Sequence, residues 1–349
     1  MKKVEFLLPS VPAPIGGFKV VYHQARILKR AGYAVNVQHV NVVKKDRRFI
    51  KKYISILNFL RRKYFDIWKY YPKYYDLDYS VSNEINQKDD INLWVVASWQ
   101  LLEQVMNNKF FIKKNIAHIS MDYPNYMGPK EKVLKSWNYN IAYLPISKNL
   151  EESILNENPL AKTFYIPALV GDYIKKLKNK KKRKIFCVIS SGKYKNQYNL
   201  IQLLNKLSKF IYIETFSREL RPKILHSSIK HFRNLSNEKI LNSYAESMYS
   251  ISYSEFEGFS IPGFDAMMNG CILFTTNNFG NIDYINPGKD CILLDGKNID
   301  TDINIIKQNF EISETERFNI ARNAIKTCNN FLTKYDNTFV LDTYNKLMH

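Results

Sequence analysis

Apolar residues at the start of the chain alternate between short continuous runs and helical spacing. The run over 4–8 predicts a buried strand, and residues 18–31 place their apolar side chains on one face of a helix. The loop over 9–17 is rich in Pro and Gly, and Gly32 ends the helix before a second apolar run over 34–39. Strand, glycine loop, helix and strand in this order are typical of a parallel α/β domain.

The same alternation continues to the end of the chain and predicts a second domain of this kind. Further strands are expected over 93–98, 116–120, 141–146, 184–190, 211–215, 230–232, 249–253, 271–275 and 291–294. Ser147 has the context of a helix N-cap, and Ser313 with Glu316 has the spacing of a capping box. We therefore expect an α/β protein with two Rossmann-like domains. Its parts would be a first domain over 1–171, a linker over 172–184, a second domain over 185–333 and a final helix over 334–349.

Residues 44–75 break this pattern. Apolar and aromatic residues recur there at helical period and are interleaved with basic ones, among them Arg61, Arg62 and Lys63. We interpret 44–90 as an insertion that carries a basic amphipathic helix, a composition that suits an anionic membrane surface. A helix packed on its own domain with a solvated basic face is an equal alternative. Electrostatic binding of nucleic acid is a less favoured one.

Composition narrows the class of protein. The chain has 349 residues and a formal net charge of +20, which would attract phosphorylated substrates, anionic lipid or nucleic acid. Eight of the ten residues over 175–184 are Lys or Arg, and such a run stays solvated. The four cysteines show no paired spacing, so we expect reduced thiols and a cytoplasmic protein. No apolar run reaches the roughly 20 residues that span a bilayer.

The most informative stretch reads Ser-Glu-Phe-Glu-Gly-Phe-Ser-Ile-Pro over 254–262, after a predicted strand. Pro262 suits the first turn of a helix, and Gly270 suits the position just past the end of that helix. A helix start leaves backbone donors unpaired, and these donors favour a phosphate. Here they would be the N–H groups of Phe259, Ser260 and Ile261.

Two carboxylates flank this predicted anion site. Glu257 comes just before it, and Asp265 lies on the predicted helix. Acids repel a phosphate, but they are useful beside one if they accept hydrogen bonds from hydroxyl groups. A sugar attached to a nucleotide diphosphate carries both phosphates and hydroxyls. The alternative is that Asp265 only favours the helix dipole and that Glu257 is a solvated loop acid.

Glu257, seven intervening residues and Asp265, followed by Ala266, Met267 and Gly270, resemble the E-x7-E signature of retaining glycosyltransferase family 4. The resemblance implies the GT-B fold, in which two Rossmann-like domains face each other across a cleft and the last helix returns to the first domain. It also implies that Glu257 contacts the donor sugar, that Asp265 contacts the ribose, and that loop amides from Gly258 onward hold the diphosphate. Asp265 departs from the usual Glu and is shorter by one methylene.

The resemblance extends to further positions. Gly16 and Gly17, at the start of the first helix, resemble the glycine loop beside the donor phosphate, although they could be turn glycines. Lys193 fits the basic residue that neutralises the leaving diphosphate. Lys195 is a candidate for the second such residue, although it lies closer than the family spacing and could be a solvated loop lysine. His118 is a candidate for the family histidine near the sugar, although a lone His is more often structural.

The expected activity follows from the resemblance. It is transfer of a hexose-type unit from a nucleotide sugar to a hydroxyl group, with retained anomeric configuration and with no metal or other cofactor. We expect a surface glycan or lipid-linked acceptor, reached at the inner face of the membrane through 44–75, and Asp122 and Tyr123 could line the acceptor side. Two alternatives are a non-catalytic subunit of a glycosyltransferase complex and a basic nucleic-acid-binding protein on a transferase-like scaffold.

Overall fold

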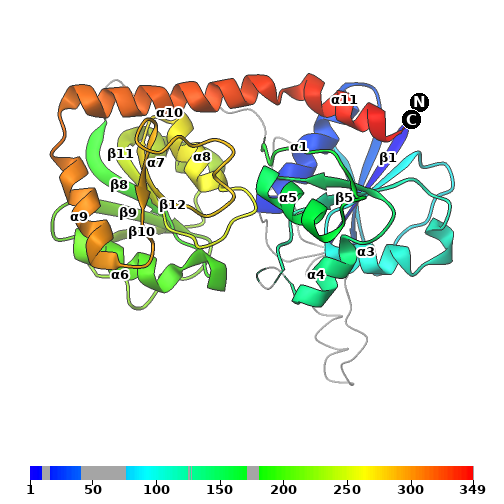
Figure 1. Cartoon of the computed structure of the whole chain (residues 1–349), viewed down its shortest axis with the longest axis horizontal. Helices are drawn as coiled ribbons and strands as arrows, with labels where there is room; N and C mark the ends of the chain where they lie inside the picture. Colours follow the sequence, from blue (N-terminus) through cyan, green and yellow to red (C-terminus); the bar gives the residue numbers. More distant parts are fainter. Residues whose placement is uncertain (10–15, 41–75, 125, 127, 171–180, 349) are drawn as a thin grey trace. The chain divides into compact units, whose positions relative to one another are not determined.

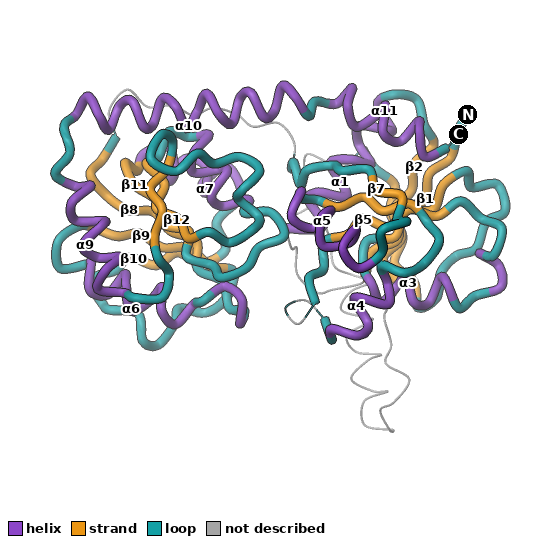
Figure 2. The backbone as a smooth tube through the Cα atoms, in the orientation of Figure 1, coloured by secondary structure: helices purple, strands orange, loops and turns teal. Residues whose placement is uncertain are grey.

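The computed structural model describes residues 1–9, 16–40, 76–124, 126, 128–170 and 181–348. It divides into unit 1, formed by Met1–Gly171 with Tyr335–His349, and unit 2, formed by Asp172–Lys334 (Figure 1). In each unit the strands form a central layer with helices around it, as Figure 2 shows. The predicted basic amphipathic segment over 44–75 lies outside the described residues.

Unit 1 is built on a seven-stranded parallel sheet with the order β3-β2-β1-β4-β5-β6-β7. Its central strands β4 and β5 are buried throughout, as strands covered on both faces are. The strand order reverses between β1 and β4, since β2 lies on one side of this pair and β5 on the other. The strands are β1 (Lys3–Pro9), β2 (Ala34–Val40), β3 (Asp78–Ser82), β4 (Leu93–Val96), β5 (Ile116–Ser120), β6 (Ala142–Pro145) and β7 (Lys162–Thr163).

The described helices of unit 1 begin mostly where the sequence offers a cap. Ser98 Oγ accepts the N–H of Leu101, and Ser147 Oγ accepts the N–H of Leu150, both at 3.3 Å. The prediction of a cap at Ser147 is confirmed. The helices are α1 (Gly16–Arg30), α3 (Trp99–Met106), the short 3-10 helix η3 (Lys109–Phe111), α4 (Lys130–Ser136), α5 (Lys148–Glu157) and α11 (Asn337–Leu347).

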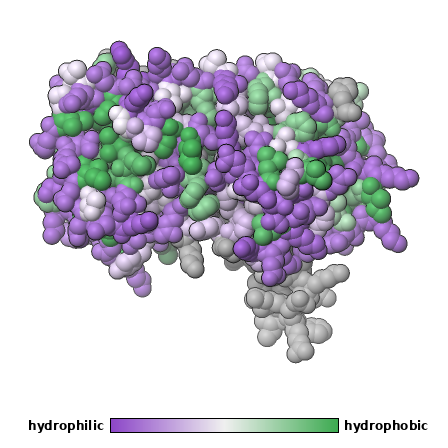
Figure 3. All heavy atoms as spheres, viewed as in Figure 1, coloured by the Kyte–Doolittle hydropathy of each residue, from purple (hydrophilic) through white to green (hydrophobic). Residues whose placement is uncertain are grey.

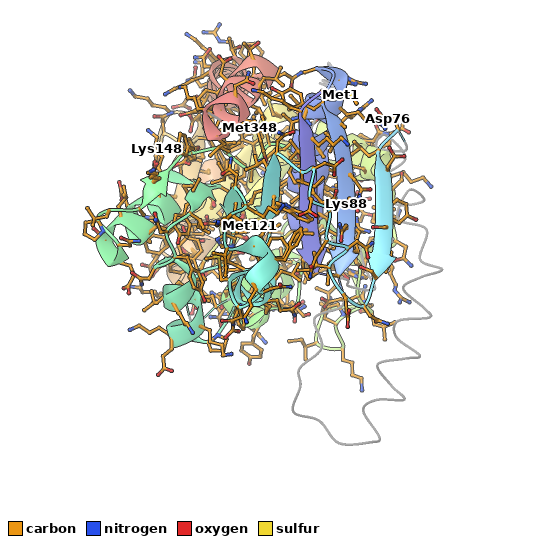
Figure 4. The ribbon with its side chains drawn as sticks, turned by 90° about the vertical axis from the view of Figure 1, so that its right-hand side faces the viewer. Met1, Asp76, Lys88, Met121, Lys148 and Met348 are labelled. Atoms are coloured by element: carbon orange, nitrogen blue, oxygen red, sulfur yellow. The ribbon has the colours of Figure 1, made fainter. Side chains whose placement is uncertain are left out.

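The C-terminal helix α11 packs on unit 1. The Tyr344 hydroxyl donates to Gln24 Oε1 at 2.7 Å, and Asn115 Nδ2 donates to the carbonyl of Leu347 at 2.6 Å. Figure 4 shows α11, with Met348 near its end, beside the strands of this unit. The expected return of the chain end to the first domain is confirmed.

Unit 2 is built on a six-stranded parallel sheet with the order β10-β9-β8-β11-β12-β13. The order reverses between β8 and β11. The strands are β8 (Lys182–Val188), β9 (Tyr212–Ser217), β10 (Lys230–Arg233), β11 (Ser247–Ser252), β12 (Ile272–Thr276) and β13 (Cys291–Leu294). The helices are η4 (Lys193–Lys195), α6 (Gln197–Leu207), α7 (Asn237–Glu246), α8 (Ile261–Met268), α9 (Ile299–Phe310) and α10 (Glu314–Lys334).

Two sets of helices cover the sheet of unit 2. Leu204 of α6 and Ile306 of α9 belong to one buried cluster with Tyr249 and Phe274 of the sheet. Helix α8 contacts α7, α10 and the strands β11 and β12, while α7 contacts β11 and α10 contacts β12. The surface drawn in Figure 3 is mostly hydrophilic. Among the described residues, no helix has the length and apolar content needed to cross a membrane.

Two predicted boundaries are wrong. β3 pairs in parallel with β2, so the end of the expected insertion over 44–90 belongs to the sheet. Its residues Asp-Tyr-Ser-Val-Ser lack an apolar run because an edge strand is only half covered. β8 begins at Lys182, inside the expected linker over 172–184. Lys184 can enter this strand because its ammonium pairs with the Glu214 carboxylate.

Candidate functional site

The motif over 254–262 lies where the strand order of unit 2 reverses. β8 and β11 are neighbours, but the chain continues from β8 to β9 on one side and from β11 to β12 on the other. In open parallel sheets, ligands bind beyond the carboxyl ends of the strands at such a point. The loop after β8 contains η4, and the loop after β11 contains Glu257. The topology therefore brings these two loops together at the favoured position.

Glu257 and Lys195 form an ion pair at this point. Lys195 Nζ lies 2.6 Å from both carboxylate oxygens of Glu257, and Ser254 Oγ donates to Glu257 Oε1 at 2.7 Å. Glu257 is buried, whereas Lys195 is partly exposed and has no further acceptor among the described residues. The two loops are also joined through the main chain, since the Tyr194 carbonyl accepts the N–H groups of Glu255 and Phe256. The pair thus fixes the carboxylate, and Lys195 Nζ has the Tyr194 ring, 5.2 Å away at its centroid, as a further neighbour.

The loop after β12 holds the backbone of Glu257. The Glu257 N–H donates to the Asn278 carbonyl at 2.9 Å. A Cβ atom on Gly280 would lie 2.6 Å from the Glu257 carbonyl oxygen, so only glycine allows the two chains to approach this closely. Thr276 Oγ1 donates to the Ser254 carbonyl at 2.6 Å. These contacts give Glu257 a rigid frame, and no local pattern in the sequence marks the residues that supply them as part of the site.

The predicted helix after Glu257 forms as α8. Pro262 lies in its first turn, and Gly270, just past its end, has a φ of 70°. Asp265 is partly exposed on this helix. Burial is the main cause that raises the pKa of Tyr244 on α7, and the negative charge of Asp265 is the second cause. The Asp265 carboxylate is therefore near enough to Tyr244 for an electrostatic interaction. Contact of Asp265 with a ribose stays a prediction.

The free amides at the start of α8 are not those expected. The Ser260 N–H donates to the Gly280 carbonyl at 3.2 Å, and the Ile261 N–H donates to the Phe259 carbonyl at 2.9 Å. The prediction of free amides at Ser260 and Ile261 is therefore wrong, because a loop from β12 and a tight local turn supply the acceptors. The N–H groups of Phe259 and Gly258 have no acceptor among the described residues. Both residues are buried, and contact of these two amides with an anion stays a prediction.

A small cavity lies beside the ion pair. Its volume is ≈ 40 Å³, and its polar lining includes Ser190, Lys195, Ser252, Ser254 and Glu257. Such a space accommodates a few water molecules or one polar substituent of a sugar, but not a whole nucleotide sugar. The main chain of Lys193 lies in η4, while its side chain lies outside the described residues. Its contact with a phosphate stays a prediction.

In unit 1, Gly16 and Gly17 begin α1 beyond the point where the strand order reverses. A Cβ atom on Gly17 would lie 3.1 Å from Met121 Sδ. The glycine therefore lets the start of α1 pack closely on the segment that follows β5, which is labelled at Met121 in Figure 4. This is a packing role, and contact of Gly16 or Gly17 with a phosphate stays a prediction.

His118 does not have the surroundings expected of a residue that contacts the sugar. It lies inside β5, is 1% exposed, and its Nδ1 is 3.2 Å from Ser120 Oγ. Burial lowers its pKa to about 3, so the imidazole is neutral. A covered neutral ring at mid-strand favours a structural role, and contact of His118 with the sugar stays a prediction. The strand ends at Ser120, and Met121 and Asp122 follow it.

Asp122 joins two elements at the same edge of unit 1. Its Oδ2 accepts the N–H of Trp99, the first residue of α3, at 3.2 Å. Burial raises the pKa of Asp122 to about 6, and the hydrogen bond from Trp99 opposes this rise. The residue as a whole is partly exposed, and contact of Asp122 with an acceptor molecule stays a prediction.

Comparisons with known proteins support the fold and do not test the roles of the candidate site residues. No family model matches the chain, and no curated protein matches it. Among solved structures, GT-B glycosyltransferases match over nearly the full length of the chain. The predicted fold of two parallel Rossmann-like domains is confirmed.

Three of these structures illustrate the match. HepE from Anabaena, solved with UDP-glucose, gives a TM-score of 0.72 at 13% identity and covers 99% of each chain. A TarM variant from S. aureus, solved with fondaparinux, α-GlcNAc-glycerol and UDP, gives 0.71 at 12% identity and covers 100% of each chain. Sucrose-phosphate synthase from Thermosynechococcus elongatus gives 0.71 at 11% identity and covers 99% of each chain.

Proposed function

We propose that this protein is a glycosyltransferase that moves a sugar from a nucleotide-diphosphate donor to a hydroxyl group of a glycan or glycolipid acceptor. One observation carries the proposal. The Glu257–Lys195 pair and its serine-lined cavity lie at the reversal point of unit 2 in a chain with the GT-B fold. HepE was solved with UDP-glucose, a member of the proposed donor class, and the TarM variant was solved with UDP, the nucleotide that such a donor releases.

Each group has a distinct proposed role. The Glu257 carboxylate accepts hydrogen bonds from hydroxyls of the transferred sugar, and Ser254, which donates to it at 2.7 Å, keeps it oriented. The Lys195 ammonium stabilises the charge that develops on the leaving diphosphate. The unpaired amides of Gly258 and Phe259 supply two further donors to the phosphates.

The finer features of the reaction are proposals from the family resemblance. We propose that the anomeric configuration is retained, that Asp265 contacts the ribose, and that Lys193 adds a second positive charge. We also propose that no metal is required, since Lys195 and the loop amides can supply the positive charge that a metal supplies elsewhere. The acceptor would be a surface glycan or lipid-linked sugar at the inner face of a membrane, reached through the basic segment over 44–75.

A thermal-shift panel tests the donor site. UDP, GDP, dTDP and their common hexose derivatives are added at millimolar concentration to the full chain. A ligand present at about 100 times its Kd stabilises the fold by roughly 2.7 kcal/mol, which is a readily measured shift. The absence of a shift with every member of the panel would count against the proposal.

A matched pair of variants ties the site to Glu257. Glu257→Gln should lower transfer by at least about 100-fold, because it removes the charged acceptor of the sugar hydroxyls. Glu255→Gln, a change of the same chemistry at an exposed position two residues away, should leave transfer unchanged. Full activity of Glu257→Gln would remove this residue from the site.

A further inference from the structure

Phe279 has a backbone conformation that phenylalanine rarely adopts. Its φ is 63°, in the left-handed region. The other two non-glycine residues with positive φ in the described part of the chain are Asn196 and Asn234. Asn tolerates this region, whereas a bulky residue there is a genuine outlier. Strain of this kind persists where the surroundings enforce it, often at binding sites.

The surroundings that enforce it are those of the candidate site. On one side of Phe279, the Asn278 carbonyl accepts the Glu257 N–H at 2.9 Å. On the other side, the Gly280 carbonyl accepts the Ser260 N–H at 3.2 Å. Phe279 therefore lies opposite the segment whose two amides remain free. Its position relative to Glu257 is set by main-chain contacts.

The ring of Phe279 stacks on the ring of Phe256. The ring centroids are 4.5 Å apart and the planes differ by 24°. Phe256 and Phe279 are both partly exposed residues. Phe256 immediately precedes Glu257, and the stacked pair thus joins the loop after β11 to the loop after β12.

We propose that the Phe256–Phe279 stack is the platform on which the transferred sugar of the donor rests, while Glu257 binds its hydroxyls. This inference rests on the proposed function. The cavity of ≈ 40 Å³ is too small for a sugar ring, so the ring must lie outside it, against a neighbouring surface. A pyranose has an apolar C–H face and polar edges, and ligand sites combine apolar walls with a few polar groups in this way. The aromatic stack and the carboxylate supply both at adjacent positions.

Calorimetric binding of three pairs of ligands, UDP-glucose and UDP, GDP-mannose and GDP, and dTDP-glucose and dTDP, tests the platform on the full chain. Phe279→Gly keeps the left-handed backbone without strain and removes only the ring. It should bind the nucleotide sugar about tenfold more weakly, the size of one aromatic contact, and the free nucleotide as wild type does. Phe279→Tyr keeps the ring and should bind both ligands within about twofold of wild type.

The outcomes separate the two proposals. A Phe279→Gly variant that binds the nucleotide sugar as tightly as wild type overturns the platform, and so does an equal loss for sugar and free nucleotide. Phe256→Leu, which loses the stack without touching the left-handed position, gives a second test with the same expected split. If wild type binds none of the six ligands and no other member of the thermal-shift panel, the proposed function fails, and the platform fails with it.

Discussion

Removing the charges of Glu257 and Lys195 separately and together distinguishes a structural ion pair from a binding site. Glu257→Gln keeps the size of the side chain and an oxygen for Ser254, but leaves the ammonium facing a neutral amide. Lys195→Met leaves the carboxylate without its cation. The double variant carries neither charge. Both separate changes break the same interaction, so their effects on stability should not add.

The expected magnitude follows from the exposure of the pair. The side chains of Lys195 and Glu257 are 21% and 8% exposed, with Nζ 2.6 Å from the carboxylate. Breaking a fully buried pair costs roughly 3–5 kcal/mol, and an exposed pair contributes about 1 kcal/mol or less. We therefore expect each single variant to lose about 2 kcal/mol of the free energy of unfolding. A domain of about 150–250 residues shifts by roughly 2–4 °C per kcal/mol, so the Tm should fall by about 4–8 °C.

The double variant is the decisive measurement. It should unfold within a few degrees of wild type, because the cost of burying an unpaired charge is gone. Its transfer from UDP-glucose, or from the donor found by thermal shift, should stay at least about 100-fold below wild type. Wild-type transfer or donor affinity in the double variant would show that the pair serves only folding and would refute the proposed site.

A matched control is available in the same unit. Lys206 Nζ lies 2.6 Å from Asp300 Oδ1, but these side chains are 49% and 77% exposed. Asp300→Asn should change the free energy of unfolding by less than about 1 kcal/mol and leave transfer unchanged. A loss as large as that of Glu257→Gln would show that exposure does not explain the difference between the pairs.

Three further predictions concern unit 1 and the basic segment. Burial raises the pKa of Asp122 from 3.8 to about 6, so wild type loses stability as the pH rises through this window. Asp122→Asn should therefore be more stable than wild type by about 1 kcal/mol at pH 7.5 but not at pH 4. An equal gain at both pH values would contradict this effect. Burial lowers the pKa of His118 from 6.5 to about 3, so wild type loses stability as the pH falls below about 6.5. His118→Leu should reduce this loss in Tm scans, while transfer at pH 7 should be unchanged. Lost transfer with an unchanged Tm would place His118 in the site. Replacing Arg61, Arg62 and Lys63 with Glu should weaken sedimentation of the protein with phosphatidylserine vesicles by at least about tenfold. Equal sedimentation of the variant and wild type would exclude docking through these residues.

Local signals in the sequence determined the elements and the location of the motif. The strands β5 and β13 have the predicted bounds, 116–120 and 291–294. Ser313 and Glu316 form the predicted capping box, with the Ser313 N–H donating to Glu316 Oε2 at 2.9 Å. These predictions succeed because apolar runs, caps and prolines act on residues only a few positions away.

Contacts between distant segments decided what the candidate site contains. Lys195 and Glu257 are 62 positions apart, and only the neighbouring positions of β8 and β11 bring them within 2.6 Å. The Gly280 carbonyl takes the Ser260 amide that the helix start alone would leave free. His118 is a candidate for a sugar contact in the sequence, but the neighbouring elements bury it. The physical reason is that hydrogen bonds, charge pairs and burial depend on which loops and helices meet around a sheet, and no local pattern encodes that meeting.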